Sequence, residues 1–271
     1  MEGMEKPREV FRQLMNTAIA NETRRQHGIK VPEPSMHMLF TGNPGTGKTE
    51  MAKAIGKAYY GMGLVGKDSF VHIKDPNSEL IDPVVGMTPQ KVQRVFDKAR
   101  GGVLFIDEFS NLTDAARSGT GYAGEALNTM IPLIEEYRHD TVVIMAGYSK
   151  NLPDLFAVNE GYESRFRTRV DFPDYSDEAL VKIAPRIAER DYEMQLSPEA
   201  QKRMPEVLAR WDATQRNGNA RSLRNEIDTA ITRMNNRLAP LVNDDGFDMK
   251  QLQVLTPEDF GLPTRKRSRA G

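Results

Sequence analysis

The sequence predicts an α/β protein with a mostly parallel sheet covered by helices on both faces, followed by a small helical domain. Three observations support this prediction. Short apolar runs typical of buried strands alternate with helical patterns as far as residue 172. A glycine-rich segment at residues 42–49 separates the first of these runs from a helical pattern. From Asp177 onward the β-branched runs disappear and helical patterns dominate.

The individual elements follow in order along the chain. Apolar residues at helical spacing among charges predict a first helix over 8–27, and an apolar run that stops at glycines predicts the first strand over 36–41. The same criteria predict the remaining elements. The expected strands are 70–73, 103–106, 141–146 and 170–172, and the expected helices are 49–62, 89–99, 124–137, 177–190, 197–212 and 219–238.

The segment between the first strand and the next helix carries a phosphate-binding motif. It reads Gly42, Asn43, Pro44, Gly45, Thr46, Gly47, Lys48, Thr49 and fits G-x-x-x-x-G-K-[ST], the P-loop or Walker A motif. Glycines let backbone N–H groups turn toward phosphates at a helix N-terminus, whose partial positive charge favours anions. We therefore expect ATP here, with Lys48 on the β and γ phosphates, Thr49 on Mg²⁺, and Glu50 beside them. A glycine-rich turn with a chance lysine is the alternative, which the strand and helix on either side disfavour.

An acid pair ends the strand predicted over 103–106. Asp107 and Glu108 follow four apolar residues, about sixty residues beyond Lys48. A buried parallel strand carries such acids to the carboxyl edge of the sheet, where open α/β sheets bind ligands. We expect Asp107 to hold the Mg²⁺ shell and Glu108 to polarise the attacking water, as in a Walker B segment. Without the phosphate loop, the same acid pair would indicate only that a strand ends at the solvent-exposed surface.

Composition excludes several other kinds of protein. Lys plus Arg number 37 and Asp plus Glu 38, so a formal net charge of −1 gives no bulk attraction for nucleic acid. With no cysteine and four scattered histidines, neither disulfides nor a thiolate or H-E-x-x-H metal site is expected. The charged N-terminus and the lack of a long apolar run predict a cytoplasmic protein.

These motifs together resemble a family. GNPGTGKT, GGVLFIDE, AGY, SRF and NARSLRNEID look like AAA+ ATPases, and more narrowly like the group with red-type rubisco activases (CbbX-like) and the type VII secretion ATPase. The resemblance runs from about residue 8 to 239. It implies a homo-oligomer, a ring of six subunits by analogy, which hydrolyses ATP and acts as a chaperone-like remodeller of a protein partner.

The resemblance also implies roles for two arginines. Arg165 falls where these ATPases present an arginine finger to the neighbouring subunit's γ-phosphate, although Arg167 and Arg169 are near enough to serve instead. Arg221 matches the sensor 2 position, at which a guanidinium from the lid contacts the nucleotide of its own subunit. Arg224, one turn later, is its competitor.

Two positions depart from the family pattern. Tyr148 stands near the sensor 1 position, where most relatives have asparagine. Either its hydroxyl orients the lytic water, or its side chain is only a packing residue. Val84 falls on the pore-loop position, where threading rings carry an aromatic residue, and so leaves substrate threading in doubt. We also expect residues 113–122 to form a mobile second loop.

The chain is thus expected to divide into four parts: an N-terminal helix (1–30), an AAA+ nucleotide-binding domain (31–175), a helical lid (176–240) and a partly disordered tail (241–271). Two other functions stay open. One is an ATP-dependent switch or scaffold with slow hydrolysis. The other is a DNA-directed ATPase, for which the basic TRKRSR segment is the sole positive sign.

Overall fold

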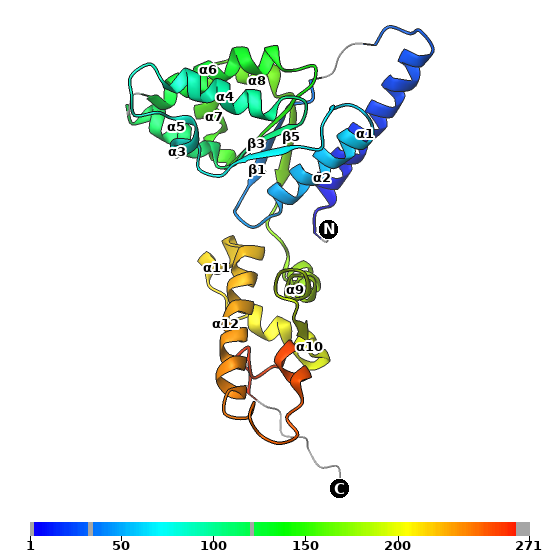
Figure 1. The fold of residues 1–271 in the computed structure, drawn as a ribbon, viewed down its shortest axis with the longest axis vertical. Coiled ribbons are helices and arrows are strands. Elements are labelled where there is room, and N and C mark those ends of the chain that lie inside the picture. The colour runs from blue at the N-terminus through cyan, green and yellow to red at the C-terminus, as the bar shows by residue number, and fades with distance from the viewer. Residues whose placement is uncertain (1–2, 32–34, 120–121, 264–271) are drawn as a thin grey trace. The chain divides into compact units, whose positions relative to one another are not determined.

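The structure is a computed structural model that describes residues 3–31, 35–119 and 122–263 (Figure 1). The basic tail segment discussed above lies outside these residues. The chain divides into two compact units, of which one holds residues 4–42 and 47–173, and the other holds residues 43–46 and the chain from Asp174 onward. Among the described residues, no helix is both long and apolar enough to cross a membrane.

The first unit is built on a parallel sheet of five strands, in the order β2-β3-β4-β1-β5. The strands are β1 (Met38–Gly42), β2 (Phe70–Ile73), β3 (Val103–Ile106), β4 (Val142–Gly147) and β5 (Thr168–Phe172). All five strands expected from the sequence are present, and β2 and β3 have the expected bounds. The α/β fold is therefore confirmed.

Helices cover both faces of this sheet. They are α1 (Glu5–Gln26), α2 (Lys48–Gly61), α3 (Pro76–Leu80), α4 (Thr88–Ala99), α5 (Phe109–Arg117), α6 (Tyr122–Glu136), α7 (Leu152–Val158) and α8 (Gly161–Arg165), with a 3₁₀ turn η1 (Ser149–Asn151). Figure 1 shows α4, α6 and α7 on one side of the sheet and α2 with α1 on the other. Because side chains alternate along a strand, Leu104 packs in the core beneath α4 and α6, while Val103 faces α2 at Gly56.

Helix α5 corrects one expectation. The segment 113–122 was expected to be a mobile loop, but α5 extends to Arg117 and Thr113 is fully buried in it. Ser110, Leu112 and Thr113 are the buried positions in the middle of this helix, whose opposite face is polar. The glycine- and serine-rich part of the segment begins only at its C-terminal end.

The second unit is helical, as the sequence predicts. Its helices are α9 (Asp177–Tyr192), α10 (Pro198–Leu208), α11 (Ala213–Asn217) and α12 (Ala220–Leu238), with β6 (Gln195–Leu196), η2 (Met249–Gln253) and β7 (Val254–Leu255). Ser176 and Ser197 start α9 and α10, because each hydroxyl accepts a hydrogen bond from the backbone N–H three residues later.

The packed core of this unit continues past the expected boundary at residue 240. Strand β7 pairs in parallel with β6, and Leu255, Phe260 and Leu262 are buried against the helices. The buried Asp259 carboxylate accepts two hydrogen bonds from Arg237 of α12, at 2.9 and 3.0 Å. Much of the segment expected to be a tail therefore belongs to the helical unit.

Candidate active site

The turn from β1 into α2 has the geometry of an anion site. Gly47 adopts φ 91°, a left-handed conformation that favours glycine, and α2 begins immediately after it without a capping side chain. The first N–H groups of a helix have no partner within the helix and favour an anion. Lys48 is the first residue of α2, and its Nζ donates to the carbonyl of Gly42 at 2.8 Å. The ammonium group thus lies across the turn, as binding a phosphate there would require.

Residues 43–46 of the phosphate loop belong to the second unit, where hydrogen bonds hold them. Asn43 Nδ2 donates to the Asp174 carboxylate at 3.0 Å, and the backbone N–H of Ala220 donates to the carbonyl of Gly45 at 3.3 Å. Arg221, in the first turn of α12, is in the same unit and has an exposed side chain. Glu50, by contrast, lies exposed on α2 with its carboxylate 3.6 Å from Lys53 Nζ.

The acid pair lies beside the start of α2. Thr49 Oγ1 donates to Asp107 Oδ2 at 3.5 Å, so the two residues predicted to bind Mg²⁺ are in contact. Strand β4 separates β1 from β3, and all three strands end at the same edge of the sheet. The structure therefore brings Lys48, Thr49 and Asp107 to the carboxyl edge.

Glu108 has a backbone conformation that the sequence does not reveal. Its φ of 53° and ψ of 46° place a non-glycine residue in the left-handed region, at a cost of about 1 kcal/mol, directly before α5. Its carboxylate accepts a hydrogen bond from Asn111 Nδ2 at 3.3 Å. Neither the strain nor the contact with Asn111 follows from the apolar strand and acid pair that mark this segment.

Two other residues that lie near this part of the site are not indicated by the sequence. His72 of β2 places its Nε2 3.7 Å from Asp107 Oδ2, in an aromatic cluster with Phe70 and Phe105. Ser110 Oγ of α5 accepts a hydrogen bond from the backbone N–H of Tyr148 at 3.1 Å, which ties α5 to the end of β4. No motif marks either residue, since their proximity depends on strand order and helix packing.

The segment between α3 and α4 presents two exposed aliphatic side chains. Val84 and Val85 are 60% and 80% exposed. The Asp82 carboxylate accepts the N–H of Val84 at 3.0 Å, and the N–H of Met87 donates to the Val84 carbonyl at 3.1 Å. The tip is therefore a hydrogen-bonded turn with an apolar surface.

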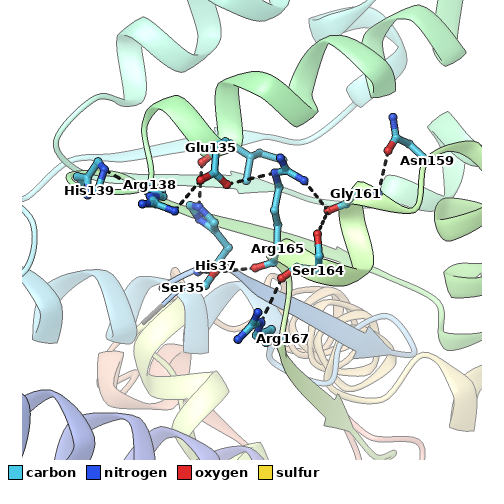
Figure 2. Close-up of polar contacts among 11 residues, drawn as sticks. Ser35, His37, Glu135, Arg138, His139, Asn159, Gly161, Ser164, Arg165 and Arg167 are labelled. Carbon is cyan, nitrogen blue, oxygen red and sulfur yellow. Dashed lines mark hydrogen bonds and ion pairs between the residues drawn. The ribbon is translucent and has the colours of Figure 1, made fainter. Parts of the chain in front are cut away.

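Arg165 lies among polar groups at the end of α8 (Figure 2). Its Nη1 donates to the Gly161 carbonyl at 3.2 Å, and its Nε lies 3.5 Å from Glu135 Oε2 of α6. Arg167 Nε donates to the Ser164 carbonyl, and Arg169 pairs with Glu163 at 2.9 Å. Of the three arginines near this position, Arg165 is the one that pairs with a carboxylate of α6.

Strand register shows on which edge of the sheet Arg165 lies. Thr168, the first residue of β5, is opposite Met38, and Phe172 is opposite Gly42. Strands advance by about 3.3 Å per residue, so the four steps from Met38 to Gly42 separate the two edges by about 13 Å. Arg165 comes three residues before β5 and is therefore at the amino edge, opposite the phosphate loop.

A buried histidine holds this amino edge together. His37 Nδ1 accepts from the backbone N–H of Val143 at 3.1 Å, and Nε2 donates to the Ile134 carbonyl at 3.1 Å. The pKa of His37 is lowered to about 4, chiefly by burial and to a smaller extent by the charge of Arg165, against opposing contributions from the Ile134 carbonyl and Glu135. The ring is therefore neutral at pH 7, and it joins the start of β1 to β4 and to the end of α6.

Together, the anion site at α2 and the acids at the end of β3 define a nucleotide-binding protein of the P-loop class. Comparison with known families specifies the class. The model of the ATPase family associated with various cellular activities (AAA) matches residues 38–174, and that of the AAA lid domain matches residues 176–270. The chain belongs to the AAA family of ATPases and is an ATP-hydrolysing enzyme.

Several relatives match nearly the whole chain. Stage V sporulation protein K of Bacillus subtilis (strain 168) is 36% identical, over 96% of this chain and 79% of its own. Protein CbbX of Cereibacter sphaeroides is 34% identical, over 95% and 82%. ESX-1 secretion system protein EccA1 of Mycobacterium leprae (strain TN) is 36% identical, over 88% of this chain but 43% of its own. The group that the sequence resembles is thus confirmed.

Proposed function

We propose that this ATPase works as a ring-shaped homo-oligomer, of six subunits, that uses ATP to remodel a protein partner. The observation that carries the proposal is the position of Arg165 at the amino edge of the sheet. An arginine side chain is too short to span the sheet to its own phosphate loop. A neighbouring subunit's nucleotide is the natural target of such a residue, because a guanidinium supplied in trans stabilises the transition-state charge.

Within one subunit, the carboxyl edge supplies the other groups for hydrolysis. Lys48 and the N–H groups at the start of α2 would hold the phosphates, and Glu108 would polarise the attacking water. Thr49 and Asp107 would hold Mg²⁺, which neutralises phosphate charge when bound. Among the described residues no group of three or more His, Asp or Glu is arranged to hold a metal. Mg²⁺ usually binds through one or two protein ligands together with phosphates and water, so the pair Thr49 and Asp107 would be enough to hold it.

A protein is the partner class we propose, because the exposed tip at Val84 and Val85 suits contact with an apolar stretch of polypeptide. The names of the relatives do not narrow this further. One at 33% identity is named ribulose bisphosphate carboxylase/oxygenase activase of Cyanidioschyzon merolae, while the relative from Bacillus subtilis is named for sporulation. Rubisco activation is accordingly one specific form of the proposal.

The test is the ATPase rate per subunit against protein concentration, with particle mass followed in parallel. We expect the rate to rise cooperatively as rings form, and Arg165→Ala to assemble normally with a rate lower by roughly a thousandfold or more. Arg167→Ala, at an exposed arginine two residues away, is the matched control and should keep most of the activity. A rate that depends neither on concentration nor on Arg165 would refute the ring proposal and favour a nucleotide switch.

A further inference from the structure

The Arg165 side chain is held on two sides within its own subunit. Figure 2 shows it running between Glu135, near the end of α6, and the carbonyl of Gly161, at the start of α8. Its main chain is fixed as well, because Ser35 Oγ donates to the Arg165 carbonyl at 2.6 Å. A quarter of the side chain nevertheless remains exposed. The guanidinium is therefore oriented without being enclosed.

Glu135 is itself fixed by a second partner. Arg138, in the turn just after α6, places its Nη1 2.6 Å from Glu135 Oε1, which leaves Oε2 facing Arg165. The backbone next to it is anchored, because the Ile134 carbonyl accepts from the buried His37 ring. The carboxylate thus occupies a defined place, whereas an unsupported surface glutamate would sample several rotamers.

We propose that Glu135 is a positioning residue for the arginine finger, a role that rests on the trans function proposed above for Arg165. A guanidinium carries five N–H donors. Glu135 faces the Nε edge and Gly161 takes one hydrogen of Nη1. Within the described part of the chain no other group accepts from the guanidinium, so Nη2 and the second Nη1 hydrogen can meet an anion on the neighbouring subunit. Glu135 thus selects which edge of Arg165 meets the phosphate.

Magnitudes favour a positioning role over a stabilising one. Both side chains of the pair are partly exposed, at 25% and 45%, and an ion pair of this kind contributes about 0–1 kcal/mol to stability. Displacing a catalytic group by about 1 Å, by contrast, can lower a rate by roughly a hundredfold. Loss of Glu135 should therefore change the rate far more than it changes folding.

The experiment compares Glu135→Gln and Glu135→Ala with Glu136→Gln, all in the full chain and at concentrations where rings form. We expect both Glu135 variants to assemble and melt like the wild type, with kcat lower by roughly ten- to a hundredfold and KM for ATP unchanged. Glu136 is the adjacent, exposed carboxylate, and its variant should match the wild type. Arg138→Ala, which frees Glu135 on one side, should lower kcat to a smaller extent.

Subunit mixing distinguishes this role from a structural defect. A Glu135→Ala subunit keeps its own phosphate loop and acids, while a Glu108→Gln subunit keeps its finger but has a disabled site. Mixed rings place intact fingers beside intact sites, so the mixture should hydrolyse ATP faster than either variant alone. A damaged α/β unit in the Glu135 variant would give no such recovery.

Other outcomes would overturn the inference. Normal kcat in both Glu135 variants, while Arg165→Ala is inactive, would refute positioning by Glu135 and leave the trans role of Arg165 intact. A raised kcat would show that Glu135 restrains the finger, and failure of Glu135→Gln to assemble would make it an assembly contact. If Arg165→Ala itself stays active, the proposed function fails first.

Discussion

The neutral state of His37 should make the stability of the α/β unit depend on pH. The folded-state pKa is lowered from 6.5 to about 4, so between these values the unfolded chain binds a proton that the folded chain does not. The stability due to neutral His37 is complete above pH 6.5 and is lost as pH falls toward 4. Using these two values, lowering the pH from 7 to 5 should cost about 2 kcal/mol through this residue alone.

The assay is urea unfolding followed by circular dichroism at pH 7 and pH 5. The variant His37→Gln replaces the imidazole by a side chain that stays neutral, so we expect its loss of stability over this interval to be smaller than that of the wild type by about 2 kcal/mol. Glu135 and Arg165, the charged groups that act on His37, are unchanged in this variant. His139→Gln, at an exposed histidine, should behave like the wild type. Equal losses in wild type and His37→Gln would refute the reasoning.

Two further predictions concern packing, one in each unit. A Cβ at Gly147 would lie 2.6 Å from Phe109 Cε1, so Gly147→Ala should cost about 1–3 kcal/mol and lower kcat by displacing α5; an unchanged melting temperature would contradict this. Asp259→Ala should destabilise the helical unit by about 1–3 kcal/mol, because Arg237 loses a buried carboxylate that accepts two of its hydrogen bonds. Fluorescence of Trp211, buried in that unit, reports its unfolding, and a midpoint equal to the wild type's would count against the role of Asp259.

Contiguous patterns made the fold and part of the site predictable from sequence. The phosphate loop and the acid pair are each a short run whose residues act together, and each follows an apolar strand that periodicity reveals. The contact between Thr49 and Asp107 then follows, because parallel strands deliver both segments to one edge.

Contacts between distant residues were not predictable in this way. Glu135 and Arg165 are 30 positions apart, and their pairing depends on how α6 packs beside α8. The C-terminal boundary of the helical unit could not be predicted in this way, because its last strand, β7, has only two residues, too few to show a period. The left-handed Glu108 is likewise invisible, since no residue preference marks a strained glutamate.

For the three arginines before and within β5, the sequence supplies a resemblance but no direction in space. Register supplies that direction. Strand β5 starts level with β1, and Arg165 comes just before β5, so Arg165 lies at the amino edge of the sheet. Strand β1 has five residues. It begins directly after His37, which anchors the surroundings of Arg165, and it ends at Gly42, the first residue of the phosphate loop. A chain that places its anion-binding groups and its arginine at opposite ends of the same strand cannot join them by a side-chain movement. The proposed ring would join them through a second copy of the chain, and hydrolysis that depends on assembly is therefore the sharpest test of that proposal.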